Sequence, residues 1–379
     1  MNESLRDRAL RLHREAPLSD VHVHTSLKAY LFRRNLWKHL WSGKTFDPFA
    51  SRSDFVMLKR GAVGAAWSVH YLPERELFAD CFLVRLAASL LIPDFKRLVS
   101  GSEFEQLLAM LDILEAEIRK HPDEVEVAYS VADLDRIRSE GKLAVVHTIE
   151  GTHVLEKKLE NLDVLADRGV AMIALAHFYP NGVAAHVDGI PTDMFVRKLC
   201  QFDLRIGQQE PLSDFGREVI ARMKERRMLV DVTHCSPAAR EAIYKEVGDD
   251  HPIMASHVGV HRYNPDPYNL SEEEIRHIAR GGGAIGVVFI SYWLDENHPK
   301  DGVEAICNTI EYIRDVTDSW DHIVLGTDFD GFTDPPDDLR DASHVWKVTA
   351  ELLRRRVPEP AVSQILGGNA RRILERSWR

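Results

Sequence analysis

Eight short apolar runs recur along this 379-residue chain, and stretches with helical periodicity separate them. Each run holds five to eight residues and is almost continuously apolar. Such runs are typical of strands that are buried on both faces of a parallel sheet. The eight runs are Ser19–His24, Val63–His70, Leu143–Glu150, Val170–His177, Met228–His234, Ile253–His257, Ala284–Ile290 and His322–Asp328.

The intervening stretches carry helix signals. The segment Phe104–Arg119 places leucine and isoleucine side chains on one helical face. The segment Phe215–Arg227 follows Ser213, which predicts an N-cap at that serine. A further helix is expected after Ser271, where Glu274 stands at the position of a capping box.

Alternating strands and helices predict a (β/α)8 TIM-type barrel, with an open doubly wound sheet as the structural alternative. We expect one domain over residues 1–379, with an N-terminal helix in 1–18 and C-terminal helices in 346–379. Two connections are long, 25–61 after the first run and 178–212 after the fourth. Both leave the C-terminal face of a barrel, where active sites are built.

The first long connection is rich in aromatic and basic residues, and it allows two interpretations. One is an amphipathic helix that caps the barrel. The other is a lid that supplies aromatic and cationic contacts to a substrate. The residues concerned are Tyr30, Phe32, Arg33, Arg34, Trp37, Lys38 and Trp41.

Composition excludes several classes of protein. A formal charge of −11 argues against a basic nucleic-acid-binding surface. The sequence has no run of 18 apolar residues, so we expect no membrane-spanning helix. The charged N-terminus lacks the apolar segment of a signal peptide. The 4 cysteines lie far apart without paired metal spacing, so we expect no need for disulfides and a cytoplasmic location.

Five of the eight runs end in residue types that bind metals. His22 and His24 alternate along the first run and therefore share one face. A single histidine at a strand end is usually structural. Metal-binding residue types at the C-terminal ends of five strands together favour a metal site. The other residues at these ends are Glu150, His234, His257 and Asp328. His70 and His147 depart from the pattern and are expected to be structural.

Imidazole nitrogen and carboxylate oxygen are the ligands that Zn²⁺ accepts at catalytic sites. Four histidines and two acids exceed the needs of one zinc ion. A bridging carboxylate from Glu150 would hold two ions about 3.5–4 Å apart. The sequence therefore predicts a centre with two Zn²⁺ ions per chain.

Taken together, the order and spacing of eight short motifs resemble the membrane (renal) dipeptidase family of the amidohydrolase-type metal-dependent hydrolases. Each motif alone is weak, and the resemblance covers nearly the whole chain. The motifs are Ser19–His22, Thr148–Gly151, Ala176–His177, Leu212–Gly216, Asp231–His234, Ser256–His257, Gly326–Gly331 and Ile365–Asn369.

The resemblance implies a zinc-dependent dipeptidase-like hydrolase that cleaves an amide bond of a dipeptide or N-acyl amino acid through a metal-bound hydroxide. It implies that His22 and His24 bind the first zinc, that His234 and His257 bind the second, and that Glu150 bridges both. It also implies a small-molecule substrate and a homodimer, with no nucleic-acid or membrane partner.

Two further roles follow from the resemblance. Asp328 would take up the proton of the attacking water and return it to the leaving amine. His177 would stabilise the oxyanion of the tetrahedral intermediate.

The chain departs from the family pattern at two positions. His24 stands where the family has an aspartate. Tyr268 stands where the family has an arginine that binds the substrate carboxylate, although Asn269 follows it as expected. Arg262, or Arg33 and Arg34 in the first long connection, are the candidates to replace that arginine.

Because this arginine is missing, the alternative is an amidohydrolase that acts on another class of substrate. The candidate substrates are a D-aminoacyl amide, a lactone, a cyclic amide or a phosphoester. A metal-binding homologue without catalysis is the third interpretation, and the presence of Glu150, His234, His257 and Asp328 argues against it.

Overall fold

The computed structural model of the chain describes residues 3–43, 47–190, 192 and 195–378. Its sheet is entirely parallel. The strands are β1 (Leu18–Val23), β2 (Val63–Tyr71), β3 (Val125–Val127), β4 (Leu143–Glu150), β5 (Met172–Ala174), β6 (Leu229–Asp231), β7 (Ile253–Val258), β8 (Ala284–Val288) and β9 (Ile323–Gly326).

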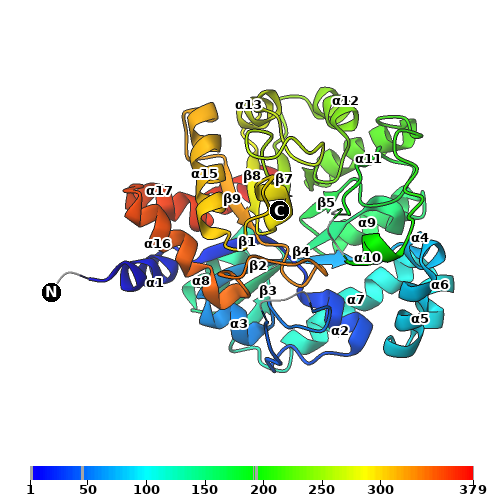
Figure 1. Cartoon of the computed structure of the whole chain (residues 1–379), viewed down its shortest axis with the longest axis horizontal. Helices are drawn as coiled ribbons and strands as arrows, with labels where there is room; N and C mark the ends of the chain where they lie inside the picture. Colours follow the sequence, from blue (N-terminus) through cyan, green and yellow to red (C-terminus); the bar gives the residue numbers. More distant parts are fainter. Residues whose placement is uncertain (1–2, 44–46, 191, 193–194, 379) are drawn as a thin grey trace.

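Eight of these strands close into a barrel. The strand order is β2-β1-β9-β8-β7-β6-β5-β4, and β2 pairs in turn with β4. Along that closing seam, Ala65 lies opposite Ala144 and Tyr71 lies opposite Glu150. Helices surround the ring (Figure 1). The predicted (β/α)8 barrel is confirmed, and the open sheet is excluded because the two edge strands pair with each other.

Each of the eight predicted runs overlaps a barrel strand, although β5 and β6, which lie in the fourth and fifth runs, hold only three residues each. The additional strand β3 was not predicted. It holds three residues and pairs with the beginning of β4, where Val125 lies opposite Leu143. A three-residue strand carries too few apolar positions to show a periodicity.

The helices begin and end where the capping residues indicate. Ser213 accepts a hydrogen bond from the backbone of Gly216, and Ser271 and Glu274 form the expected capping box. The longer helices are α1 (Leu5–Glu15), α2 (Thr25–Phe32), α5 (Phe82–Leu91), α7 (Glu103–Ile118), α8 (Val131–Ser139), α9 (Leu159–Asp167), α11 (Asp214–Glu225), α12 (Pro237–Val247), α13 (Glu272–Arg280), α15 (Val303–Thr317), α16 (Trp346–Arg354) and α18 (Asn369–Ser377). The shorter ones are α3 (Phe55–Arg60), α4 (Arg75–Asp80), α6 (Phe95–Ser100), α10 (Phe195–Leu199), α14 (Ser291–Leu294) and α17 (Glu359–Ser363).

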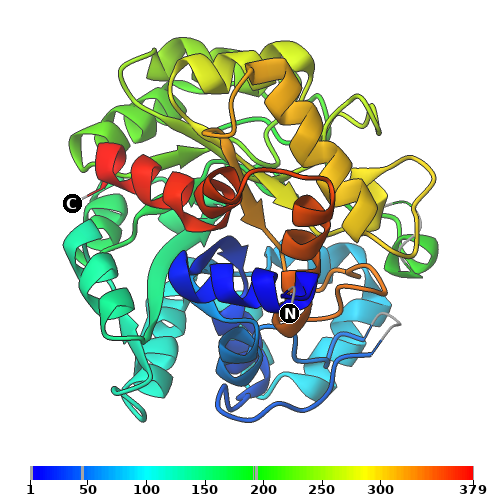
Figure 2. The same ribbon diagram turned by 90° about the vertical axis from the view of Figure 1, so that its left-hand side faces the viewer.

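The two ends of the chain lie on one side of the barrel. Helix α1 packs against α16. Helices α1 and α18 both face the viewer in Figure 2. No described helix has the length and apolar character needed to cross a bilayer.

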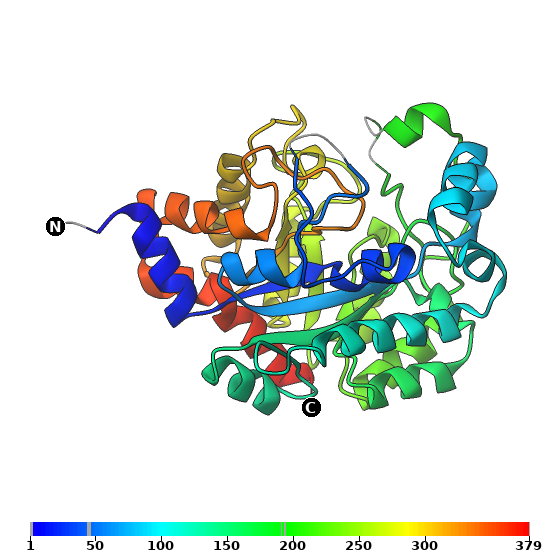
Figure 3. The ribbon, with the colours of Figure 1, turned by 90° about the horizontal axis from the view of Figure 1, so that it is seen from below.

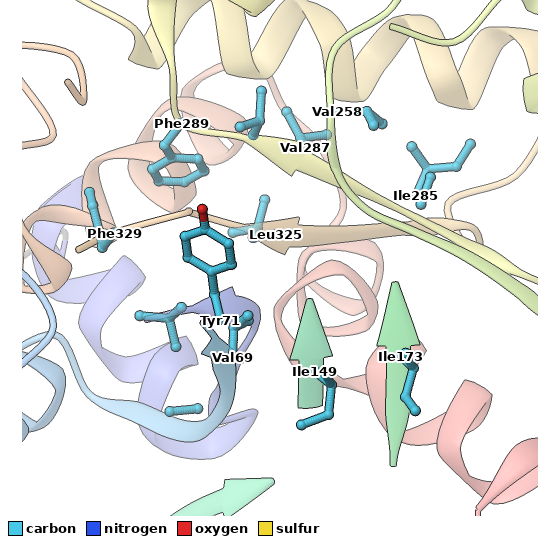
Figure 4. Packing of buried hydrophobic residues seen from close by; sticks show 14 of the residues in the cluster. Val69, Tyr71, Ile149, Ile173, Val258, Ile285, Val287, Phe289, Leu325 and Phe329 are labelled. Atoms are coloured by element: carbon cyan, nitrogen blue, oxygen red, sulfur yellow. The ribbon is translucent and has the colours of Figure 1, made fainter. Parts of the chain in front are cut away.

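The barrel strands are buried on both faces. Ile149, Ile173 and Leu325 belong to the larger core cluster, part of which is shown in Figure 4. Val146 in β4 and Met254 in β7 belong to a second cluster. Along both strands, residues of the two clusters alternate, because successive side chains point to opposite faces. Glu150 shares the face of Val146, so this second face leads toward the polar strand ends.

A disulfide joins two segments that lie far apart in the sequence. Cys81, between α4 and α5, pairs with Cys200, which follows α10. Helices α4–α6 and α10 lie together at one edge of the molecule (Figure 3). This pair departs from the expectation of a chain that needs no disulfide, since a separation of 119 residues leaves no spacing signal. Cys235 and Cys307 are free and buried.

Candidate metal centre

The C-terminal ends of the barrel strands bring buried acids and imidazoles together. Backbone hydrogen bonds align the first and last strands, since the Asp328 amide donates to the His22 carbonyl at 2.9 Å. The residues that meet are His22 and His24 at the end of β1, Glu150 at the end of β4, His177 after β5, His234 after β6, His257 in β7 and Asp328 after β9. Each of these seven side chains was predicted from the sequence as a site residue.

Glu150 lies at the centre of the cluster. Its Oε1 atom lies 3.2 Å from Nε2 of His234 and 3.5 Å from Nε2 of His257. The same oxygen lies 3.4 Å from Nε2 of His22, whereas Oε2 lies 3.5 Å from Nε2 of His24. One carboxylate therefore faces four imidazole nitrogens.

The four Nε2 atoms form two pairs. Those of His22 and His24 lie 3.3 Å apart, and those of His234 and His257 lie 3.2 Å apart. Asp328 Oδ1 lies 3.0 Å from Nε2 of His24 and joins the first pair. His22, His24 and Asp328 offer ligand atoms that all lie within 4.8 Å of one another. Glu150 belongs to two further groups whose ligand atoms also lie within 4.8 Å of one another. One includes His22 and His257, and the other includes His177 and His234.

Ser256 orients one histidine of each pair. Its Oγ lies 3.0 Å from Nδ1 of His22 and 2.9 Å from Nδ1 of His257. Asp231 holds this strand end, because its Oδ1 accepts hydrogen bonds from the Ser256 amide at 3.1 Å and from the Thr233 hydroxyl at 2.8 Å. A hydroxyl that accepts from both Nδ1–H groups leaves both Nε2 lone pairs facing the cluster.

Burial sets the charge of these rings. It lowers the pKa of His22 and of His257 well below the ordinary value, despite the nearby Glu150 carboxylate. Burial also lowers the pKa of His234, to about 4. At neutral pH these three rings are therefore neutral, which is the protonation state that metal coordination requires.

Burial acts on Asp328 in the opposite direction. It raises the pKa of the Asp328 carboxyl, and the contact with His24 offsets only part of this rise. Asp328 adopts φ 56° and His234 adopts φ 65°, both in the left-handed region. Non-glycine residues rarely adopt this conformation, and it is found preferentially at functional sites.

The site contains two side chains that the sequence analysis missed. Glu74 Oε1 accepts a hydrogen bond from Nδ1 of His177 at 2.8 Å, and the Tyr71 hydroxyl donates to Glu74 Oε2 at 2.6 Å. Burial alone would lower the pKa of His177, but Glu74 and Glu150 outweigh it and raise that pKa. Glu74 lies three residues beyond β2, so its closeness to a strand end was the available signal.

The donor set fits a metal centre. Glu150 Oε1 is buried, yet it has no hydrogen-bond partner among the described residues. Three buried imidazole nitrogens surround it at 3.2–3.5 Å. A buried carboxylate oxygen without a donor is costly unless a cation accompanies it. Imidazole and carboxylate together are the ligands of hydrolytic zinc sites.

Of the four residues predicted to bind substrate, His177 lines the cavity that adjoins this cluster, whereas Arg262, Tyr268 and Asn269 lie outside it. Tyr268 is fully buried, stacks on Trp293 and donates its hydroxyl to the His257 carbonyl at 2.9 Å. Asn269 is also buried, and its side-chain amide bonds to backbone groups, among them the Gly259 amide at 2.8 Å. Arg262 is exposed.

The first long connection lines a second cavity of about 250 Å³ that shares His24 and Phe32 with the first. Four basic residues line it, namely Lys28, Arg33, Arg34 and Lys38. Arg33 is highly exposed and pairs with Asp94, whereas Nε of Arg34 is buried and has no partner among the described residues. The connection is therefore more than a cap, because it forms a basic pocket next to the cluster.

Residues 6–377 match the family described as membrane dipeptidase, peptidase family M19. The chain is 26% identical to the dipeptidase tcpJ of Claviceps purpurea, over 87% of this chain and 71% of that protein. It is 23% identical to the dipeptidase ataJ of Aspergillus terreus, over 97% of this chain and 86% of that protein.

Solved structures share the fold. The probable dipeptidase PvdM of Pseudomonas aeruginosa aligns with a TM-score of 0.76 at 21% identity, over 98% of each chain. A metallopeptidase of Rhodobacter sphaeroides, liganded with a phosphinate mimic of L-Ala-D-Ala, aligns with a TM-score of 0.76 at 18% identity. That alignment covers 96% of this chain and 99% of the other.

Proposed function

Because this chain belongs to the membrane dipeptidase family of metal-dependent hydrolases, we propose that it uses zinc to hydrolyse the amide bond of an N-acyl amino acid or a dipeptide. The observation that carries the proposal is the position of Glu150 among the Nε2 atoms of His22, His234 and His257. Ser256 leaves the Nε2 atoms of His22 and His257 without a proton beside this carboxylate, an arrangement that a bound cation would stabilise.

His22 and His24 would hold one ion, His234 and His257 the other, and Glu150 would bridge them. When bound, Zn²⁺ polarises the scissile carbonyl and lowers the pKa of the attacking water. Family membership supports a metal cofactor. The buried, unpartnered Oε1 of Glu150 supports a centre between the two histidine pairs.

Asp328 is the proposed proton carrier. It accepts a proton from the attacking water as the new C–O bond forms and donates it to the leaving nitrogen as the C–N bond breaks. The products are a carboxylic acid and a free amine. The raised pKa of the buried Asp328 carboxyl suits this cycle, because it brings the proton affinity closer to working pH.

His177 is the proposed oxyanion ligand. Its Nδ1–H donates to Glu74, and the raised pKa of the ring favours the imidazolium form, in which Nε2 also carries a proton and faces the cluster. That nitrogen lies 3.8 Å from Glu150 Oε2. A hydrogen bond from Nε2–H to the developing oxyanion strengthens as negative charge accumulates there.

Arg34 is the proposed partner of the substrate carboxylate, in place of the arginine that Tyr268 replaces. The basic cavity shares His24 with the catalytic cluster, so one substrate can extend between them. A guanidinium group binds a carboxylate through two parallel hydrogen bonds. Arg262 lines neither cavity.

The test is hydrolysis by zinc-loaded protein of dipeptides, N-acyl amino acids, lactones and phosphoesters, with Glu150→Ala as the inactive control. We expect amide substrates to be hydrolysed, and we expect Glu150→Ala to lose bound zinc together with activity. The exposed Glu160→Ala variant is the matched control and should keep both. Turnover of lactones or phosphoesters without any amide turnover would overturn the proposal.

A further inference from the structure

An apolar cavity of about 340 Å³ opens directly from the catalytic cluster. His24, Glu150, His177, His234 and Asp328 line its base. This volume lies near the lower end of the range of about 300–1,000 Å³ found for small-molecule sites. The cavity is therefore large enough for a substantial part of a substrate.

The walls above this base are almost entirely apolar. Helix α5 contributes Val84, Ala88 and Leu91, which the helical repeat places on one face. A second wall comes from the long connection after β5, through Ile190 and Phe202. The disulfide between Cys81 and Cys200 joins these two walls.

Above the base, the described residues that line the cavity offer no partner to a charged substrate group. None of the described residues that line it is a lysine or an arginine. Its acids are Glu150 and Asp328, and both already face imidazoles within the cluster. An ammonium group on the wall side would lose its hydration without gaining an ion pair, which is unfavourable.

We propose that the acyl side of the substrate is a large, uncharged, apolar group, so that this enzyme prefers N-acyl amino acids with alkyl or arylalkyl chains over dipeptides with a free ammonium group. This inference rests on the proposed amide hydrolysis. The cavity takes the acyl chain, and the scissile carbonyl lies at the cluster. Each added methylene buries further apolar surface until the cavity is filled.

The decisive measurement is kcat/KM for N-acyl alanines with unbranched acyl chains of increasing length, for both enantiomers of alanine. We expect kcat/KM to rise about fourfold per added methylene. Alanyl-alanine should be hydrolysed more slowly than the N-acyl alanine of equal length. A flat profile, or faster turnover of the dipeptide, would overturn the inference.

A cavity-filling variant tests whether the acyl chain lies against α5. Ala88→Phe should lower the ratio of kcat/KM for the octanoyl substrate to that for the acetyl substrate by more than about tenfold, because the added ring occupies the cavity. Ser89→Phe adds the same ring at the next, exposed position and should leave the ratio unchanged. Equal ratios in both variants would contradict the assignment of this wall.

The outcomes separate this inference from the proposed function. Hydrolysis of amides without dependence on chain length removes the inference alone. Absence of amide hydrolysis at every chain length removes the proposed function. If Ala88→Phe does not fold, the chain-length profile of the unmodified enzyme decides the question by itself.

Discussion

Glu74 accepts a hydrogen bond from Nδ1 of His177 at 2.8 Å, and this contact determines which nitrogen of the ring faces the cluster around Glu150. The second oxygen of Glu74 accepts from the Tyr71 hydroxyl at 2.6 Å. Burial alone would raise the pKa of Glu74, but His177 outweighs it and lowers that pKa to about 2. Glu74 is therefore an ionised carboxylate that positions His177.

We predict that Glu74→Gln lowers kcat about 10–100-fold, the range typical for partners of site histidines. The carboxamide keeps the shape but cannot stabilise a positively charged ring. The pKa of His177, followed by NMR titration, should fall in the variant, while bound metal stays unchanged. Glu76→Gln, two residues away, is the control. An unchanged kcat would show that Glu74 serves packing only.

The sequence predicted the barrel because its strands are buried on both faces. Runs such as Leu143–Glu150 and Ile253–His257 are continuous enough to be recognised without knowledge of the fold. The ligand candidates were visible because chemistry in a barrel collects at C-terminal strand ends. Glu150 and His257 occupy such ends, so their convergence follows from the topology alone.

Other residues could not be placed in this way. Glu74 lies in a loop, and the path of a loop depends on contacts that form only after the barrel closes. Ser256 has the composition of an ordinary strand residue, and only coordinates show that its hydroxyl reaches two imidazoles. Cys81 and Cys200 meet because the connection after β2 and the long connection after β5 fold over the same edge.

Ser256→Ala should weaken metal binding about 10–100-fold, because His22 and His257 lose the hydroxyl that fixes their Nδ1–H groups. Titration with zinc against a competing chelator measures this affinity. Ser19→Ala is the matched control, since the Ser19 hydroxyl is buried on the same barrel but makes no hydrogen bond within the described part of the chain. Equal zinc affinity in both variants would contradict the proposed orientation by Ser256.

Asp328→Asn should lower kcat by about 10²–10⁴-fold while bound metal stays nearly intact. The amide preserves the shape and an oxygen near His24, but it cannot carry the proton from water to the leaving nitrogen. Steady-state kinetics and metal analysis on the same preparation check both parts. Retained turnover would remove Asp328 from proton transfer.

Arg34→Ala should raise KM for an N-acyl amino acid about tenfold or more, because a charge-assisted hydrogen bond to the carboxylate is lost. The corresponding N-acyl amino acid amide lacks that carboxylate, so its KM should hardly change. Arg262→Ala is the control and should leave both values unchanged. The reverse result, an effect of Arg262→Ala alone, would transfer carboxylate binding to Arg262.

The pH dependence of stability should depend on Asp330, which ties the end of β9 to the first long connection. Its carboxylate pairs with Nζ of Lys28 at 2.7 Å and accepts hydrogen bonds from the Ser53 amide and hydroxyl, each at 2.7 Å. Burial alone would raise the pKa of Asp330, but Lys28 outweighs it, so this pKa lies below the ordinary value of 3.8. The folded state therefore binds this proton less readily than the unfolded state.

Asp330→Asn should lower the free energy of unfolding by about 3–5 kcal/mol at neutral pH, because it leaves the Lys28 ammonium buried and unpaired. The difference from the unmodified protein should be constant above the unfolded-state pKa of 3.8 and should shrink as pH falls through the lower folded-state pKa. Denaturant unfolding at a series of pH values measures it. Asp123→Asn, at an exposed position, is the control. A difference that persists unchanged well below the folded-state pKa would mean that the Lys28 pair does not stabilise this connection.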